Sequence, residues 1–281
     1  MSKLMPIRIH WVRHGRIAAH HGDVPLTVDG RAQAEATGRQ LGEQVGPGEA
    51  VAFLYAPTRR AHETAIALRS GIAESLSSLP DAARNGAVIR PAELRSTSAA
   101  LPDPPARLSS DRLATISLLP PVECWALRNP DIYVAGARVE LVSSATAMME
   151  QLPDSRLSAA ELMRIPFLRG FWGAADRIGY WVDHPNPPGE DARAVARRLM
   201  AFAVSLCDLP RMRPRRYVCV THSGPMRAFL RHYLLGEDPG EPDYGEPIDL
   251  LIPDERLLII RYREWQRAVA LADRAPPVPF P

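Results

Sequence analysis

Two short apolar segments that lie far apart in the sequence each end in a histidine with small or polar neighbours. Residues 7–12 run into Arg13-His14-Gly15, and residues 217–220 run into Thr221-His222-Ser223-Gly224. Runs of this length and composition predict buried strands. In a parallel sheet the carboxyl ends of the strands meet at one edge, where ligands bind. We therefore expect His14 and His222 to face the same pocket.

The rest of the sequence alternates between strand and helix patterns. Apolar runs at 51–55, 87–89 and 257–262 predict three more strands, whereas residues 30–45, 58–69, 191–206 and 225–235 have the pattern of helices. This alternation predicts an α/β fold with three layers, α/β/α, around a mostly parallel sheet. Between residues 95 and 130 six prolines stand among small polar residues, which argues against long regular elements there.

Charge and cysteine content exclude several classes of function. The 281 residues carry 34 Lys and Arg against 32 Asp and Glu, a net charge of +2, so we expect no general binding to nucleic acid or to a membrane surface. The three cysteines are scattered and odd in number, which predicts neither a disulfide framework nor a Cys-x-x-Cys metal site. The first ten residues lack the apolar core of a signal sequence, and we expect a cytoplasmic protein.

The neighbours of the two histidines suit an anion. Arg13 and Gly15 flank the first histidine, and Ser223 follows the second. An arginine offers two parallel hydrogen bonds to phosphate oxygens, and a glycine lets the backbone approach them closely. A neutral imidazole can attack phosphorus and form a phosphohistidine. These residues therefore predict a phosphate site, with Arg13, Gly15 and Ser223 as ligands and His14 as a candidate nucleophile.

Four motifs, in order along the chain, resemble those of the histidine phosphatase (phosphoglycerate mutase-like) superfamily. The resemblance covers residues 7–69 and about 186–262 and leaves the middle third of the chain unmatched. The motifs are Val12-Arg13-His14-Gly15, Leu26-Thr27-Val28-Asp29-Gly30-Arg31-Ala32-Gln33-Ala34, Pro57-Thr58-Arg59-Arg60-Ala61-His62-Glu63-Thr64-Ala65 and Val220-Thr221-His222-Ser223-Gly224.

The resemblance implies a role for each matching residue. His14 would accept the phosphoryl group, and Arg13, Arg60 and His222 would surround its oxygens. Arg60 fits the register of the motif better than Arg59 because it directly precedes Ala61. The family also uses a carboxylic acid to protonate the leaving oxygen. Glu93 or Glu123, not both, would supply it here, without a metal ion or a cofactor.

The resemblance further implies a single domain over residues 1–281, with an insertion at about 95–185 that forms a cap or specificity region at the pocket mouth. We expect a phosphatase acting on a small phosphorylated metabolite. The alternatives are phosphoglycerate mutase-like phosphoryl transfer, or a catalytically weak module that binds a phosphorylated ligand. The residues after the first motif, Arg16-Ile17-Ala18-Ala19-His20, lack the small hydroxyl residue common in the family's mutases, which favours hydrolysis. Self-association into a homodimer is left open.

Overall fold

The computed structural model describes residues 5–18, 23–78, 90–91, 115–153, 155, 157–208, 214–254 and 256–271. Within these ranges eight strands form one sheet, in the order β10-β9-β8-β1-β7-β2-β4-β3. Strands β1, β7, β2, β4 and β3 pair with one another in parallel, in that order. Strands β8, β9 and β10 extend the sheet beyond β1 by antiparallel pairing. The strands are β1 Ile7–Arg13, β2 Ala50–Tyr55, β3 Arg90–Pro91, β4 Ser117–Glu123, β7 Arg215–Thr221, β8 Pro247–Ile252, β9 Leu257–Tyr262 and β10 Trp265–Ala270.

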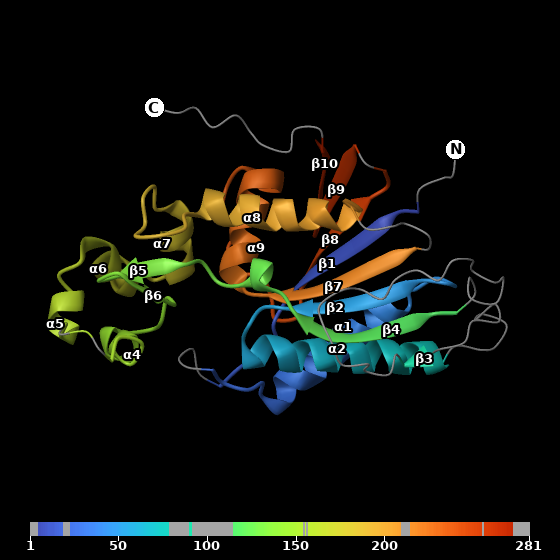
Figure 1. Cartoon of the computed structure of the whole chain (residues 1–281), viewed down its shortest axis with the longest axis horizontal. Coiled ribbons are helices and arrows are strands. Elements are labelled where there is room, and N and C mark those ends of the chain that lie inside the picture. Colours follow the sequence, from blue (N-terminus) through green and yellow to red (C-terminus); the bar gives the residue numbers. More distant parts are fainter. Residues whose placement is uncertain are drawn as a thin grey trace.

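Helices cover both faces of this sheet, as Figure 1 shows. Helices α1 (Val28–Gly42) and α2 (Arg59–Ser78) lie on one face, and α8 (Ala192–Ser205) and α9 (Ser223–Leu230) lie on the other. The three-layer α/β fold with a mostly parallel sheet, as predicted from the sequence, is confirmed. Two short segments complete this part of the chain: η2, Leu206–Asp208, and η3, Arg231–Leu235.

Local signals explain where these helices begin and how closely they pack. The Thr27 hydroxyl accepts a hydrogen bond from the Gly30 N–H at 3.0 Å, and Asp191 caps α8 in the same way, so each cap satisfies an amide that the helix leaves without a partner. Helices α1 and α2 touch at Gly71, where a Cβ would lie 2.1 Å from the Glu35 carbonyl oxygen. Glycine is therefore what allows the two backbones to meet.

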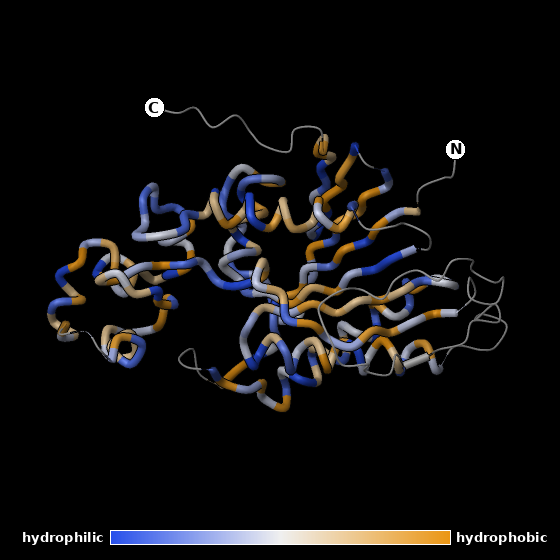
Figure 2. Tube along the Cα trace, in the orientation of Figure 1, coloured by the Kyte–Doolittle hydropathy of each residue, from blue (hydrophilic) through white to orange (hydrophobic). Residues whose placement is uncertain are grey.

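The central strands form the core of the domain. Their apolar residues are buried on both faces, and Ile9, Trp11, Phe53 and Val218 are fully inaccessible to solvent. Figure 2 shows the apolar colouring concentrated along these strands. A strand buried on both sides must be apolar almost throughout, and β1 and β7 meet this requirement until they reach the polar residues at their carboxyl ends. The core thus anchors the backbone immediately before Arg13 and Thr221.

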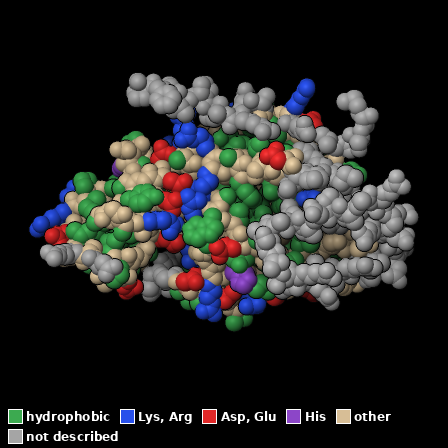
Figure 3. Space-filling view, in the orientation of Figure 1, with side chains coloured by type: hydrophobic (Ala, Val, Ile, Leu, Met, Phe, Trp, Pro, Cys, Tyr) green, Lys and Arg blue, Asp and Glu red, His purple; other side chains and the backbone are tan. Residues whose placement is uncertain are grey.

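A smaller unit lies beside the carboxyl end of the sheet (Figure 1), and we call residues 125–191 the cap. It has its own apolar cluster around Trp181, Leu168 and Ile132. Acidic and basic side chains mix in the band that separates it from the rest of the domain (Figure 3). Arg198 of α8 pairs with Glu190 of the cap at 3.0 Å. The cap elements are η1 Trp125–Leu127, β5 Ile132–Val134, β6 Ala137–Val139, α4 Ala145–Met149, α5 Ala159–Leu162, α6 Pro166–Gly173 and α7 Arg177–Asp183.

The segment that we expected to be an insertion, about 95–185, is therefore divided. Residues 92–114 lie outside the described ranges. Strand β4 belongs to the main sheet, where it pairs in parallel with β2, and only the part after it forms the cap. The expected strand at 87–89 also lies outside the described residues. Across the described ranges, no helix has the length and apolar character that crossing a membrane requires.

Candidate active site

The parallel pairing of β1 with β7 brings the two histidines together. Arg13 lies opposite Thr221 in this register, and the His14 N–H donates a hydrogen bond to the Thr221 carbonyl oxygen at 3.0 Å. The imidazole rings of His14 and His222 consequently have their centroids 5.2 Å apart. Both side chains are buried, with 6% and 4% of their surfaces exposed. The strand ends therefore meet where the sequence predicted.

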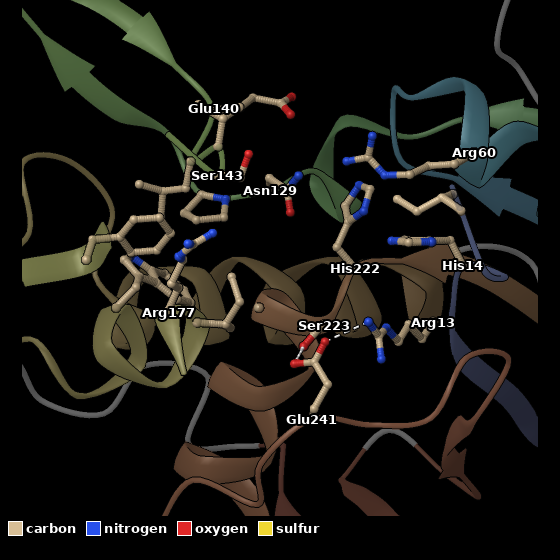
Figure 4. Close-up of a pocket in the computed structure, with 18 residues that line it drawn as sticks. Arg13, His14, Arg60, Asn129, Glu140, Ser143, Arg177, His222, Ser223 and Glu241 are labelled. Atoms are coloured by element: carbon tan, nitrogen blue, oxygen red, sulfur yellow. Dashed lines mark hydrogen bonds and ion pairs between the residues drawn. The ribbon is translucent and has the colours of Figure 1, made fainter. Parts of the chain in front are cut away.

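The two histidines line one cavity of about 280 Å³ together with Arg13, Arg60 and Ser223. Figure 4 shows Arg60 and His14 on one side of it and His222 at its centre. Arg60 is the second residue of α2. One turn later, the Thr64 hydroxyl donates to the Arg60 carbonyl oxygen at 2.6 Å and accepts the Gly15 N–H at 3.0 Å. Thr64 thus fixes the start of α2 against the end of β1.

Gly15 sets the tautomer of His14. The His14 Nδ1 lies 2.9 Å from the Gly15 carbonyl oxygen. A carbonyl oxygen can only accept, so Nδ1 carries the proton and Nε2 keeps the lone pair. The chain approaches very closely here, because a Cβ on Gly15 would lie 2.4 Å from the Gly30 carbonyl oxygen. A glycine at this position therefore permits the turn that orients the nucleophilic nitrogen.

Several buried nitrogen atoms around His14 have no hydrogen-bond partner among the described residues. They are Nε of Arg60, Nε of Arg13 and both ring nitrogens of His222. Burial lowers the pKa of Arg60, and burial, followed by the positive charge of Arg60, lowers the pKa of His222 well below its ordinary value. Buried polar groups without partners are costly. An anion bound among them would satisfy the donors and offset the positive charge.

Arg13 differs from Arg60 because its guanidinium already forms an ion pair with a carboxylate. Its Nη2 lies 2.6 Å from Glu241 Oε1, its Nη1 donates to the Pro242 carbonyl oxygen, and its guanidinium stacks on the Tyr244 ring at 4.0 Å. The Ser223 hydroxyl donates to the other oxygen of the same carboxylate at 2.5 Å, and Figure 4 shows both contacts. Two of the residues predicted to bind phosphate thus hold Glu241 in this structure.

The structure describes only one of the two glutamates predicted as the acid. Glu93 lies outside the described residues. Glu123 ends β4 with its side chain exposed and does not line the cavity. Among the described residues, the carboxylates that line it are Glu241 and Glu140. Glu140 follows β6, and the Gln151 amide holds its backbone by hydrogen bonds of 2.8 and 3.1 Å.

The sequence contained little signal for Glu140, Glu241 or Tyr244. Glu140 belongs to the part of the chain without a recognisable motif, and the other two lie in an irregular Gly- and Pro-rich loop. Loops of this kind have no periodicity that indicates where their side chains point. As for metal ligands, the described ranges contain no group of three His, Cys, Asp or Glu residues that could hold an ion.

Comparison with known proteins identifies one family. The family model described as histidine phosphatase superfamily (branch 1) matches residues 9–81 and 169–268, more than half of the chain. The two matched blocks include Arg13, His14, Arg60 and His222 and omit the cap as far as residue 168. None of the curated proteins matches this chain.

Solved structures of similar fold include proteins with different activities. A mycobacterial glucosyl-3-phosphoglycerate phosphatase is 17% identical, with 86% of this chain and 89% of that chain covered and a TM-score of 0.45. The phosphoglycerate mutase from Bacillus anthracis str. Sterne is 13% identical, with 89% of each chain covered and a TM-score of 0.46. The structure named mycobacterial hydrolase 1 is 16% identical, with 94% and 100% covered and a TM-score of 0.48. Identities at this level do not transfer an activity to this chain.

Proposed function

The chain belongs to the histidine phosphatase superfamily (branch 1), and we propose that it hydrolyses a small phosphate monoester through a phosphohistidine on His14. One observation carries the proposal. The partly buried side chain of Arg60 and the buried side chain of His222 have buried nitrogen atoms without partners among the described residues, and they lie beside the histidine whose Nε2 keeps its lone pair. This arrangement matches the needs of a phosphoryl group, which brings oxygen acceptors and negative charge to a nucleophile.

The reaction has two steps. In the first, the Nε2 lone pair of His14 forms a bond to phosphorus while the bond from phosphorus to the ester oxygen breaks, and a carboxylic acid gives its proton to that oxygen. In the second, water attacks the phosphohistidine, its proton passes to the carboxylate, the N–P bond breaks and inorganic phosphate leaves. Arg60 stabilises the equatorial oxygens in both steps. No step requires a metal ion or a cofactor.

Three carboxyl groups are candidates for the acid. Glu93 and Glu123 remain predictions from the sequence, and the cavity adds Glu140. Its carboxylate makes no hydrogen bond with a described residue, and its charge acts on Arg60, whose pKa it raises against the effect of burial. Glu241 is a poor candidate because three donors, from Arg13, Ser223 and Arg227, already hold its oxygens.

The test is turnover of a panel of phosphate monoesters in the presence of EDTA. We expect phosphate release by the wild type and none by His14→Ala. The matched control, His184→Ala, removes a cap histidine that does not line the cavity, and it should retain activity. After a denaturing quench at alkaline pH, parallel acid and base treatments should separate a phosphohistidine, which is acid-labile and base-stable, from a phosphoserine, which is acid-stable and base-labile. Unchanged turnover in His14→Ala, or a strict metal requirement, contradicts the proposal.

Parallel Glu→Gln variants at 93, 123 and 140 identify the acid. Only the true donor should slow a substrate with a poor leaving group, by roughly 10²–10⁴-fold. A substrate with a good leaving group needs no proton in the first step and should be affected much less. If all three variants turn over normally with the poor leaving group, the acid lies elsewhere and this part of the mechanism is wrong.

A second candidate function has one observation in its favour. Glu241 already neutralises Arg13, which is the arrangement expected of a catalytically weak module that binds a phosphorylated ligand. Binding of phosphate esters without turnover would support this alternative. Transfer of phosphate from one ester to another alcohol, rather than to water, would indicate a mutase. A cytoplasmic location and a small phosphorylated metabolite as the ligand remain proposals.

A further inference from the structure

The cavity extends beyond the space around His14. Its far side is formed by the cap, through Asn129, Ser143, Phe171, Arg177 and Trp181. Figure 4 shows the Arg177 side chain rising from its helix towards Ser143 and Asn129, on the side opposite His14 and Arg60. A phosphoryl group fills only part of a 280 Å³ cavity. The remaining walls therefore contact the organic part of the ester.

Arg177 is a cation without a partner. Among the described residues none forms a hydrogen bond or an ion pair with its guanidinium, although it lines the cavity. Other arginines of the cap and its neighbouring helices are paired: Arg128 and Arg138 contact Asp131, Arg198 contacts Glu190, and Arg231 contacts Asp183. Ser143 and Asn129, its neighbours across the cavity, likewise have no side-chain hydrogen bond to a described residue. An arginine left open beside two uncommitted polar side chains is suited to an anionic ligand group.

The helix that follows His222 holds the helix of Arg177 in place. Asp176, the residue before it, caps α7 by accepting the Gly179 N–H at 2.9 Å and pairs with the buried guanidinium of Arg227 at 2.5 Å. Arg227 belongs to α9, which begins directly after His222. Because this ion pair, with its arginine buried and its aspartate exposed, joins the two helices, Arg177 and His222 keep a defined separation within the one cavity that they both line.

Apolar side chains form much of the wall between these two ends, beside Asn129 and Glu140. Ile178 and Trp181 of α7, Phe171 of α6, and Leu141 and Val142 after β6 form this part of the wall. They offer contact area to carbon and little hydrogen bonding to hydroxyl groups. A chain or ring that carries many hydroxyls would lose its hydration here without compensation, whereas a compact hydrocarbon body would gain from burial.

Resting on the function proposed above, we infer that Arg177 binds a second anionic group of the substrate, across a compact apolar body from the phosphate. The substrate class is then a phosphate monoester of an apolar, aromatic or branched aliphatic alcohol that carries a carboxylate or a second phosphate at its far end. Asn129 and Ser143 donate hydrogen bonds to that group, and Phe171 and Trp181 contact the body.

Binding of non-hydrolysable phosphonates tests the inference without turnover. Three ligands test the apolar body and the second anion separately. Benzylphosphonate carries the phosphonate and the apolar body, phosphonoacetate carries the phosphonate and a carboxylate without the body, and 4-carboxybenzylphosphonate carries all three groups. We expect calorimetry on the wild type to show that 4-carboxybenzylphosphonate binds roughly 10–100-fold more tightly than either of the others, the range expected for a charge-assisted hydrogen bond. The 3-carboxy isomer and a ring with two phosphonates show which spacing and which anion fit best.

Variants of Arg177 assign the preference to its side chain. Arg177→Gln should weaken 4-carboxybenzylphosphonate about 10–100-fold and leave benzylphosphonate unchanged, and Arg177→Lys should restore part of the loss. The control Arg169→Gln removes the same charge from an exposed position of α6 that does not line the cavity. It should leave the Kd of both phosphonates unchanged. Equal loss for both ligands in Arg177→Gln, or no preference in the wild type, overturns the inference.

The outcomes remain distinct from those of the proposed function. A carboxylate preference that depends on Arg177, in a protein that hydrolyses no ester, would support the subsite and contradict the phosphatase. Hydrolysis of esters with neutral and anionic ends at equal kcat/KM would support the phosphatase and contradict the subsite.

Discussion

Glu241 competes with the ligand for Arg13, and the substitution Glu241→Gln measures how strongly. The carboxylate lies 2.6 Å from Nη2 of a guanidinium that is almost fully buried, while 46% of the Glu241 side chain is exposed. A glutamine keeps an acceptor oxygen at this position and removes the charge. Arg13 then stays in place, and a bound phosphate no longer faces a neighbouring anion.

The geometry sets the size of the effect. An exposed ion pair contributes about 0.2–1 kcal/mol and a hydrogen bond to a buried charge about 1.5–3 kcal/mol. A pair with one buried and one half-exposed partner falls between them, at about 1 kcal/mol. Because about 1.4 kcal/mol is a factor of ten in affinity, Glu241→Gln should bind inorganic phosphate roughly fivefold more tightly. The gain should shrink at high salt, since the carboxylate is partly exposed to screening ions.

The assay is calorimetric titration with inorganic phosphate at low and high ionic strength. Glu237→Gln is the matched control, because it removes the same charge from an exposed position of the same loop that does not line the cavity. It should leave the phosphate Kd unchanged. Weaker phosphate binding by Glu241→Gln would refute the reasoning and show that the carboxylate positions Arg13 for the ligand. Equal tightening in both variants would attribute the effect to net charge alone.

Two further outcomes follow from the geometry. Gly15→Ala should lower the free energy of unfolding, measured by urea denaturation, by about 1–3 kcal/mol, because its Cβ would lie 2.4 Å from a backbone oxygen. The control Gly224→Ala should be nearly neutral, because its Cβ would have a nearest contact of 3.6 Å. Equal losses of stability in the two variants would contradict this reasoning. Burial lowers the pKa of His222, so below about pH 6.5 the unfolded state binds a proton that the folded state does not. The free energy of unfolding should therefore decrease as the pH is lowered, by up to about 1.4 kcal/mol per pH unit. His222→Asn should flatten that slope in denaturation curves at pH 5–7, and an unchanged slope would refute this assignment.

The local parts of the fold were predictable because their signals are local. The apolar residues of β1 and β7 occupy consecutive positions, and each strand ends at the polar residues that leave the core. Helix α1 begins at Val28, next to its cap Thr27 and close to the start of the helix predicted over residues 30–45. The meeting of His14 with His222 followed from these strand ends because parallel strands share an edge. Strand β4 was missed because its paired prolines, Pro120 and Pro121, are unfavourable in strands.

By itself the sequence determined the family, the layered α/β fold and the two histidine motifs, since all three depend on short patterns of adjacent residues. Only the tertiary structure decided what surrounds them. Glu241 reaches Arg13 from a position more than 200 residues away, and Glu140 and Arg177 reach the cavity from the cap. The physical reason is that these side chains project from loops and short helices whose directions depend on packing between units. No periodicity in the chain encodes such directions.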